Sequence, residues 1–503
     1  MGRPRQPTDR SQCQPVGTAA RRFALICLAV LAGAGQAPRT SNPTLAITHV
    51  TIIDATGAPP VPDKTVVVAG DRIATIAKSA AVAVPAAAQT VDASGKFLIP
   101  GLWDMHAHPF LLPSVPADVF LDGYLARGVT SLRDPSGPLD AQLRGRAAQT
   151  TSARPGPRLS ISGPVLDGPV PLWPGVAIPV GTDLQARRAV RSLAQAGVDF
   201  VKVYDFLPRL AYFAIADEAR RLRLPFAGHV PIALTAADAS DAGQASIEHV
   251  IHLFESCSSE EPTLQKEALA LVARATASGR VADVPGLIRE LFHIELRAER
   301  SYDEARAAAL FARFVRNGTV SDPTLVAHSY ERGLEPRADP RLKYVPAVLR
   351  ESWRPEHYLL SRAFTAEDRA DAKRIFHRRL DLVGSMFRAG VTIVAGTDSP
   401  TTAYSIPGFA LHDELEFLVK AGLTPMAALQ AATRNAAQLA GRLDRLGTIE
   451  TGKLADLVLL DANPLDDIHN TTTITAVVVN GALRSKSDLE ALLARMEAAV
   501  KDR

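Results

Sequence analysis

The sequence contains little cysteine: of 503 residues only Cys13, Cys27 and Cys257 are cysteines. Two of them lie in the N-terminal segment discussed below, so the rest of the chain has one thiol and cannot form an internal disulfide bond. Stability must then come from a hydrophobic core. Any bound metal ion must be held by His, Asp, Glu or Lys side chains.

The chain also lacks a strong excess of either charge. Its 56 Lys and Arg residues against 53 Asp and Glu residues give a formal net charge of +3. Residues 1–37 contain five of the basic residues and one acid, which leaves 51 basic and 52 acidic residues in the remainder. Nucleic-acid binders need a basic surface, and we therefore expect no nucleic-acid partner.

The apolar run near the N-terminus is too short to cross a bilayer. It covers residues 23–34 and follows Arg21 and Arg22. A basic pair, a short apolar core and small residues up to Ala37 are typical of a secretory signal peptide. We expect residues 1–37 to be removed and the mature protein to be periplasmic or secreted, away from the membrane. An uncleaved anchor is the alternative, and the general and twin-arginine export routes both stay open.

Strand-like segments occupy both ends of the remaining chain, at residues 45–98 and 446–485. They predict one small β-sandwich domain made from both ends. Residues 99–445 alternate between strand-like and helix-like segments, and eight candidate strands in roughly 300 residues predict an α/β fold of the (β/α)₈ TIM-barrel type. A helical insertion near 255–315 and a loop-like one near 329–375 are expected to interrupt the barrel.

Six side chains with metal-binding chemistry occur at or near the ends of these predicted strands. The C-terminal ends of barrel strands converge on one pocket, so side chains far apart in sequence can meet there. The six are His106 and His108 in the first strand, Lys202 in the fourth, His229 after the fifth, His249 after the sixth and Asp398 after the eighth.

This set can hold two divalent metal ions. The two histidines of the first strand are two residues apart, so they face the same way and can bind one ion, to which Asp398 can add an oxygen. His229 and His249 can hold a second ion. Lys202 would be an ammonium beside two cations unless CO₂ converts it to a carbamate, which could bridge the ions. The set suits Zn²⁺, with Mn²⁺, Co²⁺ or Fe²⁺ as alternatives.

Each of these residues also has an ordinary structural explanation. A single histidine at a strand end usually makes a structural hydrogen bond, Lys202 alone would form a salt bridge, and Asp398 could cap a helix. Six residues in the right order, each at its own predicted strand, favour a joint site over six unrelated ones.

The motifs GLWDMHAHP, VKVY, GHV, SIEHV and AGTDSP resemble those of the amidohydrolase superfamily. The resemblance is to its imidazolonepropionase-like and Xaa-Pro or Xaa-Arg dipeptidase-like branch and extends from about residue 45 to 485. It implies a binuclear metal-dependent hydrolase. One metal ion is implied on His106, His108 and Asp398, a second on His229 and His249, and a carbamylated Lys202 between them. It is specific for fold and metal site and says little about the substrate.

We hypothesise that the enzyme hydrolyses an amide C–N bond with a hydroxide that bridges the two metal ions. The substrate would be a dipeptide, an N-acyl amino acid or a related small amide. Asp398 would accept the proton of the attacking hydroxide and return it to the leaving amine. Tyr204, two residues after Lys202 and on the same face, would donate a hydrogen bond to the oxyanion.

Two other functions remain open. The first is a hydrolase or deaminase of a cyclic C–N substrate, which commonly uses one metal ion and lacks the lysine. The second is a non-catalytic binding protein with the same fold. A homo-oligomer is compatible with the sequence.

Several more residues could reach the pocket. His252 follows the sixth strand and His328 is expected to end the seventh, and a structural role is the expected one for both. Arg133 and Arg154 could bind a substrate carboxylate, but surface arginines are common and neither is assigned that role. Trp173 is expected to pack.

Overall fold

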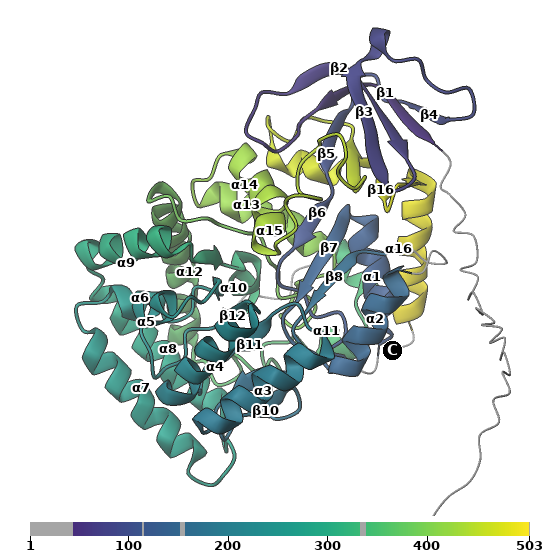
Figure 1. Cartoon of the computed structure of the whole chain (residues 1–503). Helices are drawn as coiled ribbons and strands as arrows, with labels where there is room; N and C mark the ends of the chain where they lie inside the picture. The colour runs from purple at the N-terminus through teal and green to yellow at the C-terminus, as the bar shows by residue number, and fades with distance from the viewer. Residues whose placement is uncertain (1–43, 113–114, 151–155, 332–338, 502–503) are drawn as a thin grey trace, which may run out of the picture. The chain divides into compact units, whose positions relative to one another are not determined.

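Strands from both ends of the chain form one sheet in the computed structural model (Figure 1). The structure describes residues 44–112, 115–150, 156–331 and 339–501, so the signal peptide predicted for residues 1–37 lies outside the described residues. The strand order is β17-β16-β15-β5-β1-β2-β3, and β4 pairs with β1. The strands are β1 (Leu45–Ile52), β2 (Val61–Ala69), β3 (Arg72–Lys78), β4 (Gln89–Asp92), β5 (Phe97–Pro100), β15 (Leu457–Leu460), β16 (Ile474–Val479) and β17 (Ala482–Ser485).

These strands share one hydrogen-bonded sheet, whereas the predicted sandwich has two stacked sheets. The antiparallel pair β5–β15, with Ile99 opposite Val458, joins the two chain ends. β5 also pairs with the end of β1, so the N-terminal and C-terminal strands remain connected. Side chains that alternate toward one side, such as Ile47, Val66 and Leu457, form a separate hydrophobic cluster.

The middle of the chain contributes parallel strands in two further sheets, β6-β7-β8 and β10-β9-β11-β12-β13-β14. Parallel strands that alternate with helices give the chain a TIM-barrel-like fold with an additional β domain. The strands are β6 (Leu102–Asp104), β7 (Val129–Asp134), β8 (Arg158–Ile161), β9 (Val165–Asp167), β10 (Ala177–Pro179), β11 (Val201–Val203), β12 (Phe226–Gly228), β13 (Ser246–Glu248) and β14 (Val320–Asp322).

The segment predicted as the eighth strand covers residues 390–399, and its part from 392 to 399 has only isolated bridges to its neighbours. Ser321 next to it donates its backbone N–H to Thr392 O at 2.9 Å. On the other side, Met105 donates to Ala395 O at 2.9 Å and His108 to Ser399 O at 2.7 Å. These bonds place 392–399 between β14 and the residues that follow β6.

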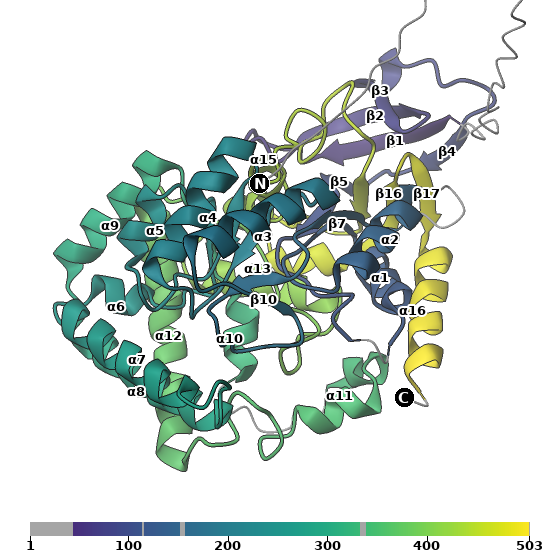
Figure 2. The ribbon, with the colours of Figure 1, turned by 60° about the horizontal axis from the view of Figure 1, so that its bottom comes forward.

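Helices cover the parallel strands and fill the loops between them (Figure 2). They are α1 (Ala117–Ala126), α2 (Leu139–Thr150), α3 (Asp183–Ala196), α4 (Arg209–Leu222), α5 (Ala236–Asp241), α6 (Leu253–Cys257), α7 (Glu261–Thr276), α8 (Val284–Arg300), α9 (Glu304–Asn317), α10 (Leu325–Glu331), α11 (Ala347–Ser352), α12 (Ala366–Arg388), α13 (Phe409–Lys420), α14 (Pro425–Ala431), α15 (Arg434–Leu439) and α16 (Lys486–Val500), with 3₁₀ turns at Ser79–Ala81, Pro340–Tyr344 and Ile468–Thr472. In α3, for example, the side chain of Thr182 caps the first turn and Gly197, at φ +81°, ends the helix.

The insertion near 255–315 is helical, as predicted, and forms α6 to α9. The prediction of a loop near 329–375 is wrong for the parts of its described residues that form α11 and the start of α12. The prolines suggested a loop, but Pro346 precedes α11, where no N–H is needed. Thr365 and Asp368 form a capping box at the start of α12.

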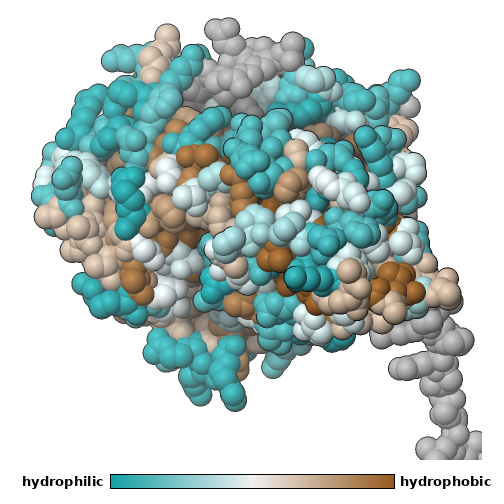
Figure 3. Space-filling model, turned by 90° about the horizontal axis from the view of Figure 1, so that it is seen from above, coloured by the Kyte–Doolittle hydropathy of each residue, from teal (hydrophilic) through white to brown (hydrophobic). Residues whose placement is uncertain are grey.

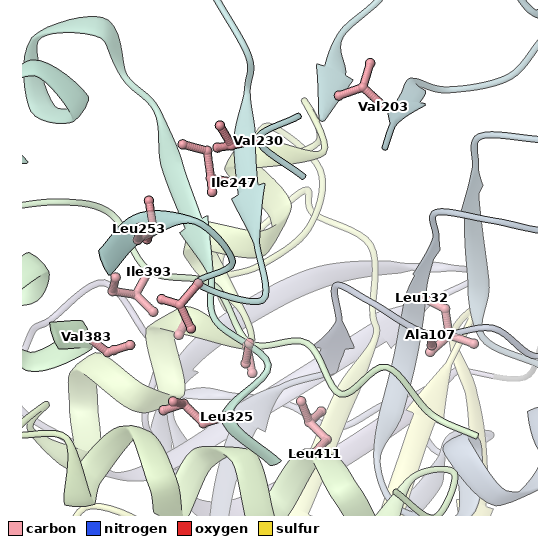
Figure 4. Packing of buried hydrophobic residues seen from close by; sticks show 14 of the residues in the cluster. Ala107, Leu132, Val203, Val230, Ile247, Leu253, Leu325, Val383, Ile393 and Leu411 are labelled. Carbon is pink, nitrogen blue, oxygen red and sulfur yellow. The ribbon is translucent and has the colours of Figure 1, made fainter. Parts of the chain in front are cut away.

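The hydrophobic core lies between the parallel strands and the helices. Figure 4 shows part of it, including Ile247 of β13, Leu325 of α10 and Leu411 of α13. The C-terminal helix α16 packs against α1. On the face seen in Figure 3, hydrophilic residues surround small groups of hydrophobic ones. Within the described residues, none of the helices has the length and apolarity that a membrane crossing requires.

Gly228 at the end of β12 should resist substitution, because it has φ +135°. A Cβ atom there would lie 2.2 Å from Val203 O and 3.0 Å from Lys202 Cδ, on the neighbouring strand. We expect Gly228→Ala to lower the free energy of unfolding by about 3 kcal/mol, measured by denaturant titration. Gly243→Ala is the control, because Gly243 has φ +87° but a Cβ atom there would meet nothing within 4 Å. Equal losses in the two variants would contradict the steric argument.

Candidate metal centre

One large cavity of about 620 Å³ opens where the parallel strands end. All six side chains singled out as metal ligands line it, and five of them are buried. His106 and His108 follow the same strand, and each of the other four comes from a different part of the strand set. The six are His106, His108, Lys202, His229, His249 and Asp398.

The first three-residue group lies where β6 meets the 392–399 segment. Asp398 Oδ1 is 2.9 Å from His108 Nε2 and 3.6 Å from His106 Nε2. One ligand atom from each of the three residues lies within 4.8 Å of the others. Asp398 has φ +56°, and its N–H donates to His106 O at 2.7 Å, which holds the carboxylate beside the two imidazoles. This arrangement suits one divalent cation.

The second group lies beside the first, at the ends of β12 and β13. The rings of His229 and His249 have centroids 4.9 Å apart, and the ring of His249 is 4.3 Å from that of His106. Asp205 Oδ1 lies 2.7 Å from His229 Nδ1, and Thr324 Oγ1 lies 2.7 Å from His249 Nδ1. Both contacts use Nδ1, which leaves Nε2 of each ring for another ligand.

The unpaired atoms of this site fit a metal ion. Nε2 of His229 is buried and has no hydrogen-bond partner, and the same holds for Nδ1 of His106. Burial is the main reason that the pKa values of His106 and His249 lie well below the ordinary range, and nearby positive groups such as Lys202 lower them further. Neutral imidazoles with free lone pairs are the form that binds metal ions.

The pKa of His108 is shifted in the opposite direction, upward. Burial alone would lower its pKa, but the carboxylates of Asp134 and Asp398 raise it to about 10. The two carboxylates thus favour positive charge at this ring, which either a proton or a metal cation can supply.

Lys202 is 98% buried and lies against Glu248, whose Oε2 accepts a hydrogen bond from Nζ. The other oxygen of Glu248 is 2.6 Å from Arg133 Nη2, which is also 3.0 Å from Asp322 Oδ2. Despite burial, Lys202 and Arg133 hold the pKa of Glu248 below its ordinary value. Burial raises the pKa of Asp322 to about 8, with Glu248 adding to the rise. A layer of compensated charge therefore lies beneath the cavity.

Sequence reasoning missed Glu248. With His106 and His249 it forms the second group whose ligand atoms lie within 4.8 Å of one another. Strict alternation along a strand would send Glu248 and His249 to opposite sides. Since His249 has φ +64°, the strand ends there and both side chains turn inward. The acidic residue in SIEHV was the available signal.

Tyr204 lines the cavity with Lys202, as the two-residue spacing predicts. Its hydroxyl oxygen is 3.0 Å from Trp173 Nε1. An indole nitrogen can only donate, so Tyr204 accepts this bond and its own proton stays available for another acceptor. Burial, assisted by Asp205, raises the pKa of Tyr204 well above its ordinary value, and the hydroxyl remains protonated.

The remaining candidates have different surroundings from those expected. The placement of His328 at the end of the seventh strand is wrong: β14 ends at Asp322, and His328 lies in α10, where it lines the cavity and hydrogen-bonds to His249 O. His252 lies outside the cavity lining, with Nδ1 3.3 Å from Glu255 Oε1. Arg154 is outside the described residues.

Arg133 and Trp173 also differ from expectation. Arg133 is 96% buried, and its ion pairs beneath the cavity leave it no role in binding a substrate carboxylate. Trp173 was expected to pack, but it is half-buried and lines the cavity.

Comparison with known proteins adds family information to this geometry. A model of the Amidohydrolase family matches residues 342–484. The imidazolonepropionase of Acidiphilium cryptum (strain JF-5) is 25% identical over 394 residues, which are 76% of this chain and 83% of that protein. Residues 342–484 thus match the amidohydrolase family, and the relative that covers most of the chain agrees with the amidohydrolase superfamily.

More local matches agree with the imidazolonepropionase-like and dipeptidase-like branch. The imidazolonepropionase of Streptococcus gordonii is 38% identical over 86 residues, 16% of this chain. The match covers only 26% of that protein, about a quarter of its length. The solved structure of bottromycin amidohydrolase has a TM-score of 0.70 at 24% identity and covers 91% of this chain and 90% of its own. That likeness shows a shared fold.

Asp205 should control metal affinity through His229. We expect Asp205→Asn to weaken metal binding by about 10- to 100-fold, because the neutral amide no longer fixes the proton on Nδ1 as a carboxylate does. Competition with a chromophoric chelator measures the affinity. Asp444→Asn, at an exposed carboxylate, is the matched control. Unchanged affinity in the Asp205 variant would show that His229 needs no such partner.

Proposed function

We propose that the protein is a metal-dependent hydrolase that cleaves the C–N bond of a small amide, such as a dipeptide or an N-acyl amino acid. The observation that carries the proposal is the convergence of six ligand-type side chains on the floor of one cavity. Relatives named imidazolonepropionase and a structural neighbour named amidohydrolase support C–N bond hydrolysis. We also infer a closed (β/α)₈ barrel, a proposal supported by the bonds from residues 392–399 to both neighbouring strands.

Two divalent cations, with Zn²⁺ the expected ion, would be held by the three-residue group of His106, His108 and Asp398 and by the pair His229 and His249. When bound, they would lower the pKa of water and polarise the substrate carbonyl.

Lys202 reaches the same floor, and we propose that its ammonium group reacts with CO₂, releases two protons and becomes a carbamate, which would help to hold the metal ions. This change replaces a cation by an anion in contact with Glu248. The added negative charge would be offset by Arg133, which contacts the other oxygen of Glu248, and by the two metal ions.

Two residues of the chain would act on the reacting atoms. The carboxylate of Asp398 would take a proton from the attacking water and return it to the leaving nitrogen. Its side chain is 17% exposed, the most open of the six, which allows contact with substrate. Tyr204 would donate a hydrogen bond from its hydroxyl group to the oxygen that becomes negative when the amide carbonyl is attacked.

A second candidate is the hydrolysis or deamination of a cyclic C–N substrate, which the imidazolonepropionases among the relatives favour. The third is a binding protein without catalysis. We further propose export through residues 1–37 and a periplasmic or secreted location.

Metal content and turnover distinguish these functions. Purified protein, supplied with Zn²⁺ and bicarbonate, is assayed for bound metal and for hydrolysis of Xaa-Pro and Xaa-Arg dipeptides, N-acyl amino acids and lactams. We expect about two metal ions per chain and amide hydrolysis that a chelator abolishes. Asp398→Asn should reduce kcat strongly while most metal stays bound. One ion per chain with lactam hydrolysis supports the second candidate, and no bound metal supports the third.

Trp173 should support catalysis through Tyr204. Tyr204→Phe should lower kcat by about 100-fold or more, because it removes the donor to the oxyanion. Trp173→Phe should lower it by about tenfold, because Tyr204 loses the bond that orients it. In the double variant the two losses should not add, since both act on one hydroxyl. Steady-state kinetics of the unmodified protein, the two single variants and the double variant measure these losses. Additive losses would show that Trp173 acts independently of Tyr204.

A further inference from the structure

The walls of the cavity differ sharply from its floor. The residues that line the space above the ligand set are largely apolar and come from loops and from both insertions. The loop between β9 and β10 gives Leu172 and Trp173, α8 gives Ile288, and the segment between α11 and α12 gives Tyr358, Leu359 and Phe364.

Packing contacts hold the apolar side chains of the wall in place. Phe364 stacks on Phe292 of α8 with ring centroids 4.8 Å apart, so the two insertions are packed together where they meet the cavity. Tyr358 and Phe364 are each less than 8% exposed. The aromatic rings are therefore held in place and present a fixed apolar surface to whatever enters.

The charges of the cavity all belong to its floor. Among the described lining residues, the one Lys or Arg is Lys202, whose amine contacts Glu248. The nearest buried guanidinium, that of Arg133, is paired with Glu248 and Asp322. A substrate carboxylate placed against the described part of the walls would be desolvated without a cation to receive it, which is costly.

We propose that the substrate is an uncharged amide with a ring-sized apolar group on at least one side of the scissile bond, and without a free carboxylate next to it. The proposal rests on the proposed amide hydrolysis and narrows its substrates to related small amides without a carboxylate, in place of the dipeptides and N-acyl amino acids named above, which become poor substrates. A volume of about 620 Å³ accommodates such a molecule above the metal ligands.

A matched pair of amides tests the proposal. N-benzoylpyrrolidine and N-benzoylproline contain the same single amide and differ only in the carboxylate. We expect kcat/KM of the metal-loaded full-length protein to be at least about tenfold higher for the neutral compound. Calorimetry on the Asp398→Asn protein should give a dissociation constant at least about tenfold lower for it. N-acetylpyrrolidine, which lacks the ring, should bind more weakly than N-benzoylpyrrolidine.

Different results would contradict the proposed amide hydrolysis and the proposed substrate class. Tighter binding of the neutral amide without hydrolysis would support the apolar cavity and contradict the proposed function. Hydrolysis with preference for N-benzoylproline would support the function and overturn the substrate class. Binding of none of the three compounds would also overturn it.

A positive charge placed in the wall should reduce the preference for the neutral amide. Leu359 is half-buried, lines the cavity and can be replaced without opening the core. Leu359→Arg should shift the ratio of the two dissociation constants toward N-benzoylproline by about tenfold. Leu210→Arg on α4, where the leucine is 80% exposed, is the control for the added charge and should leave the ratio unchanged. An equal ratio in both variants would overturn the assignment of this wall to substrate binding.

Discussion

The buried contact between Lys202 and Glu248, with Arg133 on the far oxygen, is the constraint around which the centre is arranged. These groups are almost fully removed from water, so each charge must be balanced by a neighbour. The balance fixes three strands relative to one another, because Arg133 belongs to β7, Lys202 to β11 and Glu248 to β13. The imidazoles lie above this floor. If Lys202 becomes a carbamate as proposed, Arg133 and the metal ions would take over the balance of charge.

Above this floor the ligands depend on how the strands end. His249, the first residue after β13, and Asp398, in the segment 392–399, both have positive φ and turn their side chains inward. Such conformations cost roughly 1–3 kcal/mol each and persist only where the surroundings enforce them. Here the bonds from Asp398 N–H to His106 O and from His249 N–H to Asp322 O do so. The strain therefore lies at the residues that would bind metal.

The sequence predicted the floor better than the walls, and the reason is physical. The ligand residues follow short hydrophobic strands, and their order along the chain mirrors the order of the strands, so His106, Lys202 and His229 could be placed in advance. Glu248 was missed because the alternation of side chains fails at the positive φ of His249. His328 was misplaced because β14 ends at Asp322, earlier than the sequence pattern indicated. Contacts such as that of Trp173 with Tyr204 depend on loop conformation, which no periodicity encodes.

The division between floor and walls also separates chemistry from selectivity. The floor consists of strand ends, whose backbone is tied to neighbouring strands, whereas the walls come from insertions that no barrel strand requires. Changes in Ile288 or Leu359 can therefore alter which molecules fit without moving a ligand atom. The same separation explains why motifs shared with the superfamily concern the floor. The aromatic and aliphatic wall comes from loops and insertions, and its lack of a described basic partner for a carboxylate is the feature that bears on the substrate.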